Sequence, residues 1–304
     1  QKKMLLRSPN NWPNLASSPT DMQHIPVLAP EILEGLNLHP GASVIDATLG
    51  LGGHTSFMLD ITAPDGVVVG VDRDVRNLEL AKERLKQYKD RVVYIHDSFA
   101  NIGDHDLQSV DAVLFDLGFS SLHIDDASRG FSFQKEGPLD MRYDTMQELT
   151  AEGIVNSWPR EELARLFRIY GEEERADDVA KAICKSRKTE RFTTTTQLAD
   201  LISTVISRRG KHPATKVFQA LRIAVNDELG EIEKGIKAAT GLLKPGGRIA
   251  VITFHSIEDR LVKQLFRENQ HLEVLTKKVI KPSYQETREN PRARSSKLRI
   301  AKRI

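Results

Sequence analysis

Residues 43–53 read SVIDATLGLGG, a short apolar run that leads into a glycine cluster. Such a run predicts a buried strand, and the glycines let the backbone turn tightly and approach a ligand without a side-chain clash. A second apolar run over 66–71 ends at Asp72, where a carboxylate can accept hydrogen bonds from the hydroxyls of a ribose. The strand, the glycine loop, the helix expected behind it and the acid at the next strand end together predict a nucleoside-cofactor site.

The same alternation continues along the chain from this unit. Further strands are expected where apolar runs recur, at 92–95, 111–115 and 248–254, with an amphipathic helix over 75–88. Strands that are apolar on both faces and alternate with helices are typical of a parallel sheet covered by helices.

The alternation stops between residues 122 and 214, where only helices are expected, and it resumes with one long amphipathic helix over 215–243. That helix is expected to end at the sequence KPGG of residues 244–247, because Pro and Gly do not continue a helix. We therefore predict one α/β domain built from residues 23–121 and 215–304, interrupted by a helical insertion over 122–214.

The composition is that of an ordinary globular protein, with 39% hydrophobic and 28% charged residues among 304 and no apolar run long enough to predict a transmembrane helix. The single cysteine, Cys184, excludes an internal disulfide and a cysteine-rich zinc site, and we expect it to be a small buried side chain. A net charge of +2 is too small to identify a nucleic-acid partner by itself.

Residues 1–20 contain Lys2, Lys3 and Arg7 but no acidic residue, and they include several Ser and Asn. This composition is typical of a short disordered arm and also resembles the remnant of an organellar transit peptide. We interpret residues 1–22 as a flexible basic arm. We expect an organelle of bacterial descent, with the plastid stroma preferred and the bacterial cytoplasm as the alternative.

The glycine loop also bears on the identity of the cofactor. Thr55 stands where the dinucleotide-binding fingerprint has Gly or Ala, which disfavours an NAD-dependent dehydrogenase. Residues 46–53 instead resemble motif I of the class I methyltransferases, a Rossmann-like fold, and residues 244–247 resemble a recurrent feature of that fold. This resemblance implies S-adenosyl-L-methionine as the cofactor. Phe99, just past the third strand, is a candidate to lie against an adenine ring, with an ordinary core position as the alternative.

The fourth strand ends in the sequence DLGF of residues 116–119. Ligands of open α/β sheets gather beyond the carboxyl ends of the strands, so this tip is expected to face the cofactor. Asp116 is our candidate to accept a hydrogen bond from the N4 amine of a cytosine, and Phe119 is our candidate to stack on the base. The arrangement resembles the Asp-Pro-Pro-aromatic signature of amino-group methyltransferases, with Leu-Gly in place of Pro-Pro. A loop-capping carboxylate is the alternative for Asp116.

A second cluster, FHSIEDR of residues 254–260, follows the late buried strand. His255 is a candidate to orient the base or carry a proton, since the ordinary pKa of histidine, about 6.5, lies near neutrality. A structural hydrogen bond at a strand end is the alternative for His255. His54, Glu258 and Asp259 do not have the spacing of a metal site, so we predict no metal requirement.

These residues together resemble one family, the bacterial-type ribosomal small-subunit RNA (cytosine-N4)-methyltransferases of the RsmH or MraW type. The matching blocks run from about residue 24 to the C-terminus and are 24–28, 50–53, 116–118, 129–133, 137–142, 218–223, 254–260 and 290–295. The resemblance implies a class I methyltransferase fold in which the helical insertion recognises RNA. It also implies cofactor contacts at Gly50, Gly52, Gly53, His54, Asp72, Phe99 and Asp116. His123 stands where the family commonly has Gln, and it is kept as a cofactor contact because imidazole can also donate a hydrogen bond.

The substrate that the resemblance implies is a cytidine of small-subunit ribosomal RNA in an assembled or nearly assembled subunit. Basic residues near the C-terminus and in the insertion are candidates to neutralise phosphates. Our candidates for RNA binding are Arg142, Arg292, Arg294 and Lys297. Residues 137–142 are expected to form a loop that closes over a flipped base.

Two alternatives remain open at this point. One is an NAD-dependent dehydrogenase on a similar sheet, and the other is a non-catalytic ribosome-assembly factor that retains the cofactor pocket. The oligomeric state is not indicated by the sequence.

Overall fold

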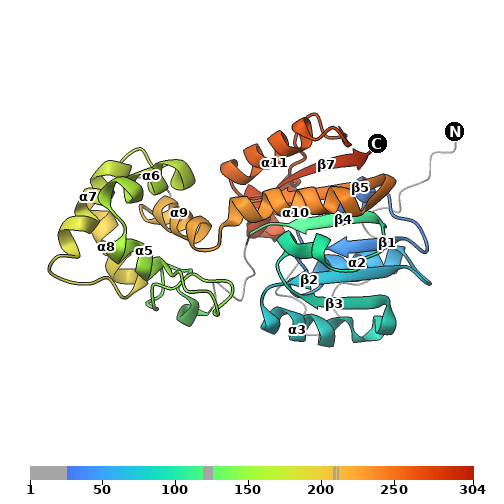
Figure 1. Cartoon of the computed structure of the whole chain (residues 1–304), viewed down its shortest axis with the longest axis horizontal. Helices are drawn as coiled ribbons and strands as arrows, with labels where there is room; N and C mark the ends of the chain where they lie inside the picture. Colours follow the sequence, from blue (N-terminus) through green and yellow to red (C-terminus); the bar gives the residue numbers. More distant parts are fainter. Residues whose placement is uncertain (1–25, 119–125, 208–209, 211) are drawn as a thin grey trace.

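The computed structural model describes residues 26–118, 126–207, 210 and 212–304. The basic arm predicted over residues 1–22 lies outside them. The described part forms an α/β unit and a helical unit that lie side by side (Figure 1). None of its helices has the length and apolarity that a membrane span needs.

Five parallel strands form the main part of the sheet, in the spatial order β3-β2-β1-β4-β5. Their bounds are β1 (Ser43–Asp46), β2 (Val67–Asp72), β3 (Val92–His96), β4 (Val110–Asp116) and β5 (Leu243–Thr253). Successive side chains of a strand point to opposite faces of the sheet. Val44 belongs to the same hydrophobic cluster as Leu78 on one face, and Ile45 belongs to the cluster of Ile236 on the other. The predicted parallel sheet covered on both faces is therefore confirmed.

Two antiparallel strands, which the sequence did not predict, extend this sheet beyond β5. The strand β7 (Lys297–Arg303) pairs with β5, and the short β6 (Leu272–Val274) pairs with β7. The chain thus places its C-terminal segment beside the central strands.

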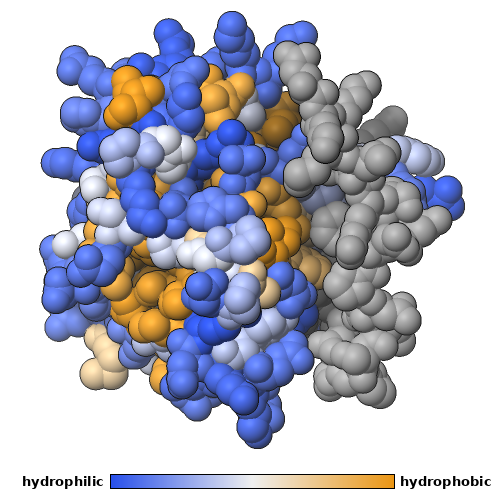
Figure 2. Space-filling model, turned by 90° about the vertical axis from the view of Figure 1, so that its right-hand side faces the viewer, coloured by the Kyte–Doolittle hydropathy of each residue, from blue (hydrophilic) through white to orange (hydrophobic). Residues whose placement is uncertain are grey.

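Helices cover the two faces of the sheet. One face is covered by α1 (Ala29–Leu36), α2 (Gly53–Ile61) and α3 (Val75–Leu85), and the other by α10 (Glu228–Leu242) and α11 (Ser256–Glu268). The shorter segments are η3 (Lys86–Arg91), η4 (Phe99–Asp104), α12 (Tyr284–Glu289) and η6 (Pro291–Ser295). On the face of the α/β unit turned away from the helical unit, mainly hydrophilic residues surround separate hydrophobic areas (Figure 2).

The helical unit has its own hydrophobic core. Its elements are η5 (Ala127–Arg129), α5 (Ala151–Ser157), α6 (Arg160–Gly171), α7 (Ala176–Ser186), α8 (Thr195–Val205) and α9 (Thr215–Val225). Because Val217, Phe218 and Leu221 of α9 belong to this core, the unit as packed extends to Val225 rather than ending at residue 214. Cys184 is partly buried against the same core.

The single long helix predicted over 215–243 is wrong, because the chain forms two helices, α9 and α10, with a break at Asn226 and Asp227. Asp227 has a left-handed backbone (φ 47°), which does not continue a helix. The Asn226 side chain is committed to backbone groups, since its Nδ2 donates to the carbonyls of Met141 and Arg222. The bond to Met141, 85 positions away in the chain, ties this break to the helical unit.

Candidate active site

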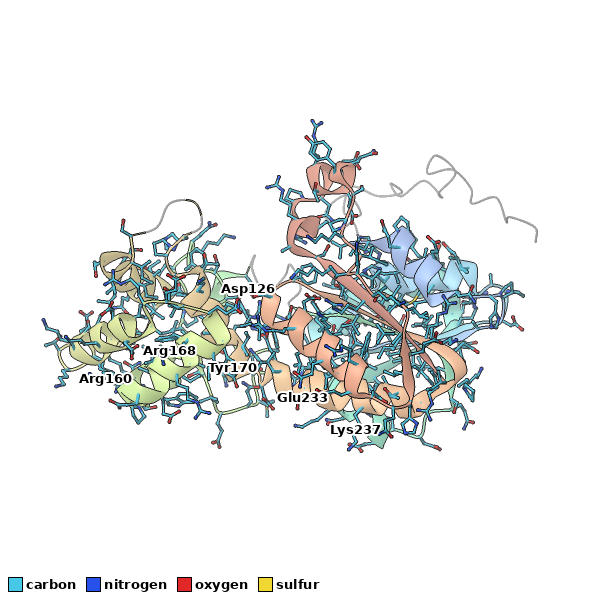
Figure 3. All side chains as sticks on the ribbon, turned by 90° about the horizontal axis from the view of Figure 1, so that it is seen from above. Asp126, Arg160, Arg168, Tyr170, Glu233 and Lys237 are labelled. Atoms are coloured by element: carbon cyan, nitrogen blue, oxygen red, sulfur yellow. The ribbon has the colours of Figure 1, made fainter. Side chains whose placement is uncertain are left out.

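Two pockets meet at the carboxyl ends of the parallel strands. The larger, of about 540 Å³, is lined by residues of both units, including Phe131 and Phe218 of the helical unit. The smaller, of about 180 Å³, lies between the ends of β1 and β2 and the start of α10. The residues that line both pockets are Thr48, Gly50, Asp116, Gly118 and Phe254. Seen from above, Tyr170 of α6 lies near the junction of the two units, whereas Arg160 and Arg168 lie farther out (Figure 3).

Asp116 lies at the border of the two pockets, at the end of β4. Its backbone N–H donates to Thr48 Oγ1 at 2.6 Å, which fixes the strand end against the glycine loop. Its Oδ2 lies 3.6 Å from His54 Nε2, while its Oδ1 is buried without a hydrogen-bond partner among the described residues. Since a buried carboxylate oxygen normally accepts a hydrogen bond, Oδ1 is available to a ligand.

Asp46 and Thr55 form a buried pair beside Asp116. Thr55 Oγ1 donates to Asp46 Oδ2 at 2.6 Å, and the Thr48 N–H donates to Oδ1 at 3.3 Å. Burial raises the pKa of the Asp46 carboxyl to about 6, although the Thr55 hydrogen bond, the charge of His54 and the Thr48 N–H oppose the rise. Thr55, which replaces the glycine of the dinucleotide fingerprint, thus holds a carboxyl group inside the protein.

Asp72 lines the smaller pocket, as expected for a residue that binds a ribose. Its Oδ2 accepts from the Gly50 N–H at 2.8 Å, and the Asn77 amide donates to both of its oxygens at 3.2 Å. Phe99 lines the same pocket and also packs edge-on against Phe115, with ring centroids 5.5 Å apart. Phe99 is therefore both a core residue and part of the pocket wall.

The loop glycines differ in what a side chain at each position would meet. Gly50 has a positive φ (52°), and a Cβ there would meet only the Thr48 carbonyl oxygen, at 3.9 Å, so the residue leaves open space in both pockets. A Cβ at Gly52 would meet Leu85 at 2.7 Å, and one at Gly53 would meet Pro26 at 2.7 Å. Packing therefore favours glycine at both positions, Gly52 also has a positive φ (75°), and Gly53 lines the larger pocket. The cofactor contacts predicted for these two glycines stay a prediction.

His54 and His255 line the larger pocket. His255 is the N-cap of α11, where its Nδ1 accepts from the Glu258 N–H at 3.3 Å. In turn, Glu258 Oε2 accepts hydrogen bonds from the backbone N–H groups of Phe254 and His255. Burial would raise the pKa of the Glu258 carboxyl, but the hydrogen bond and charge of His255, with the charge of Arg222, hold it below its usual range. The predicted site residue His255 is thus also a structural cap.

Sequence reasoning missed a buried ion pair beside this cap. Arg222 of α9 donates from Nε and Nη2 to the two oxygens of Glu228 at 2.7 and 2.9 Å, and the Tyr143 hydroxyl donates to Glu228 at 2.9 Å. Glu228, His255 and Glu258 bring ligand atoms within 4.8 Å of one another, a spacing that a metal ion could use. The Arg222 guanidinium carries one positive charge beside these two carboxylates, and its hydrogen bonds occupy both oxygens of Glu228.

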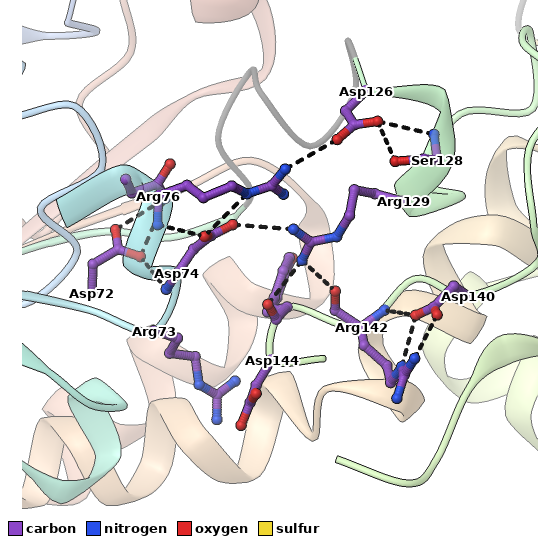
Figure 4. Close-up of polar contacts among 12 residues, drawn as sticks. Asp72, Arg73, Asp74, Arg76, Asp126, Ser128, Arg129, Asp140, Arg142 and Asp144 are labelled. Carbon is purple, nitrogen blue, oxygen red and sulfur yellow. Dashed lines mark hydrogen bonds and ion pairs between the residues drawn. The ribbon is translucent and has the colours of Figure 1, made fainter. Parts of the chain in front are cut away.

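Arg142, predicted to bind RNA, makes hydrogen bonds within its own loop (Figure 4). Its guanidinium donates to both oxygens of Asp140 and to the carbonyls of Thr145 and Gln147. These four hydrogen bonds use most of the five donors of the side chain. Its part in this structure is therefore to hold residues 140–147 together.

The other predicted RNA-binding residues lie near η6. Arg292 lines the larger pocket, whereas Arg294 donates to the Thr287 carbonyl at 3.3 Å and Lys297 lies 3.5 Å from Asp259. Arg84 of α3 also lines the larger pocket, and the sequence contained no local signal for it. Phe119 and His123, predicted to stack on the base and to contact the cofactor, lie outside the described residues.

These features fit a nucleoside cofactor bound at the smaller pocket. Asp72 and the open space at Gly50 lie at one end, and the unpartnered oxygen of Asp116 lies where the second pocket begins. A group bound there would present its reactive end to a second ligand in the larger pocket.

Residues 21–304 match the MraW methylase family. This chain belongs to that family. Membership of this methylase family identifies the cofactor as S-adenosylmethionine. The family match covers both the α/β unit and the helical unit, so the helical unit belongs to the methylase and is not an unrelated addition.

Individual relatives match over nearly their whole length. The chain is 45% identical over 309 residues to the ribosomal RNA small subunit methyltransferase H of Halothermothrix orenii, covering 93% of this chain and 99% of the relative. It is 47% identical over 286 residues to the protein of the same name from Dictyoglomus thermophilum, covering 92% and 96%. Among solved structures it is similar to an rRNA methylase from Streptococcus thermophilus, with 12% identity, a TM-score of 0.44 and coverage of 91% of this chain and 93% of that chain.

Proposed function

We propose that this chain transfers a methyl group from S-adenosylmethionine to the N4 amine of a cytidine in small-subunit ribosomal RNA. The observation that carries the proposal is the position of Asp116, whose buried Oδ1 has no hydrogen-bond partner among the described residues and lies where the two pockets meet. The N4 amine has two N–H donors, so an acceptor at this border would hold it next to the cofactor.

The substrate class is supported by the relatives. Proteins named ribosomal RNA small subunit methyltransferase H match this chain at 45% and 47% identity across almost all of their length. This likeness supports methylation of small-subunit ribosomal RNA. Asp116 supplies an acceptor suited to an exocyclic amine, and the choice of cytosine N4 among such amines comes from the family resemblance of the sequence blocks. We further propose that the substrate is an assembled or nearly assembled subunit.

The bound cofactor supplies a methyl group on a sulfonium, which is already a good electrophile, so the protein has mainly to position and polarise the amine. Asp72 would hold the ribose of the cofactor in the smaller pocket. Asp116 would accept a hydrogen bond from N4, which localises the nitrogen lone pair and stabilises the positive charge that develops there. The base would enter the larger pocket, where Phe131 and Phe254 provide aromatic walls.

The test is methyl transfer from labelled S-adenosylmethionine to small ribosomal subunits that lack this modification, followed by digestion and mass spectrometry. We expect N4-methylcytidine with the native protein and a loss of at least about a hundredfold in rate with Asp116→Asn, because the amide places an N–H donor or a weaker acceptor at the amine. Asp104→Asn, an exposed change outside both pockets, is the matched control. Label on a different nucleoside would refute the N4 assignment.

A second candidate is a non-catalytic assembly factor that keeps the cofactor pocket. Full binding of S-adenosylhomocysteine and of small subunits without any methyl transfer, on every assembly state of the subunit supplied, would favour it. Membership of a methylase family argues against the NAD-dependent dehydrogenase, and a calorimetric titration with NAD that gives no heat would exclude it.

A further inference from the structure

His255 and Asp116 both line the larger pocket. Asp116 and Ile252 are paired residues of the neighbouring strands β4 and β5, and His255 follows three positions later. Phe254 lines the same pocket, and a Cβ at Gly118 would meet its ring at 3.4 Å. A ligand in this pocket that reaches the Asp116 carboxylate therefore also faces His255.

The hydrogen bonds of His255 determine which ring nitrogen carries hydrogen. Nδ1 accepts the backbone N–H of Glu258, so Nδ1 has no hydrogen of its own, and the hydrogen of the neutral ring is on Nε2. The charged groups packed around the ring are Glu258 and, beyond it, Glu228 and Arg222. The cap at the start of α11 thus fixes both the orientation and the tautomer of His255.

The Nε2–H of His255 has no well-aligned acceptor among the described residues, although the nitrogen is buried. Glu258 Oε1 lies 3.1 Å from Nε2 without the alignment of a full hydrogen bond, so this contact satisfies the donor only in part and leaves it open to a better-placed acceptor. Only about an eighth of the side chain is exposed, at 12%. A buried donor without a well-aligned acceptor at a pocket wall is typical of a group that forms a hydrogen bond with a bound ligand.

We propose that His255 is a specificity-determining residue that donates its Nε2 hydrogen to the acceptor edge of the target cytosine, next to the amine held by Asp116. Cytosine offers the acceptors N3 and O2 beside its N4 donor, whereas uracil has a hydrogen on N3 and an oxygen at position 4. The Asp116 acceptor can pair with the N4 donor of cytosine, and the His255 donor can pair with N3 or O2. Uracil offers an acceptor at position 4 and a donor at N3, so both protein groups disfavour it. This inference rests on the proposed function and assigns His255 a role other than proton transfer.

The same geometry disfavours His255 as the base that removes the N4 proton. A base needs a free lone pair, and because the Nδ1 lone pair accepts in the cap, the other ring nitrogen, Nε2, carries the hydrogen. Asp116, whose Oδ1 lacks a partner in the described chain, remains the nearest acceptor. Loss of His255 should therefore lower the methylation rate equally across pH without altering the shape of the pH profile.

The experiment uses His255→Asn, because Asn is a good N-cap and retains the acceptor for the Glu258 N–H while removing the Nε2 donor. His39→Asn, at an exposed position far from the pocket in sequence and fold, is the matched control. Binding of cytidine and of uridine is measured by calorimetry in the presence of S-adenosylhomocysteine, and single-turnover methylation of small subunits is measured from pH 6 to 9. Thermal melting and S-adenosylhomocysteine affinity check that the fold and the cofactor pocket persist.

We expect His255→Asn to melt like the native protein and to bind S-adenosylhomocysteine with unchanged affinity. Its preference for cytidine over uridine should fall roughly tenfold to a hundredfold, the range for one lost hydrogen bond in a desolvated site, and the methylation rate should fall in parallel. Unchanged cytidine preference, or a change in the shape of the pH profile, would overturn the proposal. If the native protein makes no N4-methylcytidine, the proposed function fails, while the nucleoside titration still tests His255.

Discussion

At the scale of single residues, two neighbouring aspartates differ because their surroundings differ. Asp46 is fully enclosed and accepts from Thr55 and Thr48, whereas one oxygen of Asp116 has no hydrogen-bond partner among the described residues. The sequence pointed to Asp116 through its place at a strand end, but it gave Asp46 no role. Only the packing of the glycine loop shows that Asp46 is a buried carboxyl group beside the reaction site.

The buried Asp46 should make the protein less stable as pH rises. Its pKa in the folded protein is about 6, above the ordinary 3.8, so the folded state holds the proton more tightly than the unfolded chain. The stabilising contribution is complete below about pH 4 and is lost as pH rises through about 6, by roughly 3 kcal/mol in total. Asp46→Asn should remove this dependence. Denaturant unfolding at pH 5 and pH 8 measures it, and an unchanged pH slope in the variant would contradict the assignment.

At the scale of elements, close packing decides where helices begin, end and touch. Gly171 ends α6 against α9, where a Cβ would lie 2.6 Å from the Lys216 carbonyl oxygen. Gly241 lies within α10, where a Cβ would meet no neighbouring atom of the described residues within 4 Å. The two glycines look alike in sequence, yet only Gly171 is required by contact between helices.

This difference gives a paired prediction. Gly171→Ala should destabilise the protein by roughly 1–3 kcal/mol, because the carbonyl at Lys216 is backbone and cannot move aside without separating α6 from α9. Gly241→Ala should stabilise it by about 0.5–1 kcal/mol, since alanine has the better helix propensity. Free energies of unfolding from denaturant titrations compare the two variants. Changes of the same sign would show that the α6–α9 contact is looser than described.

At the scale of the whole molecule, a few buried ion pairs join the helical unit to the α/β unit. Arg129 donates to Asp74 at 3.2 Å and to the carbonyls of Arg142 and Tyr143, which links the end of β2 to the loop of the helical unit (Figure 4). Arg222 and Glu228 form a second link between α9 and α10. Since both pockets include residues near these links, the joint between the units also shapes the site.

Two arginines that pair with Asp74 test this joint. Arg129 is buried at 8% exposure, whereas Arg76 has half of its side chain exposed. Arg129→Met should cost roughly 3–5 kcal/mol, because it leaves the buried Asp74 without its buried partner. Arg76→Met should cost less than about 1 kcal/mol, because that pair is solvated. Denaturant unfolding and calorimetry give the free energy of unfolding of both variants. Equal losses would show that Asp74 depends no more on Arg129 than on Arg76.

The class of sheet, the glycine loop and the strand-end residues Asp72 and Asp116 could be predicted from the sequence. The spacing of apolar residues, the positions of glycines and the ends of apolar runs are local properties of the chain. Tertiary structure alone decided that α9 packs with the helical unit, that β7 joins the sheet, that Arg142 binds its own loop, and that Arg222 lies near the His255 cap. Apart from the Arg142 hydrogen bonds, which reach only residues 140 to 147, these features depend on contacts between segments far apart in the chain. The free energy of such contacts comes from burial and pairing that no local pattern encodes.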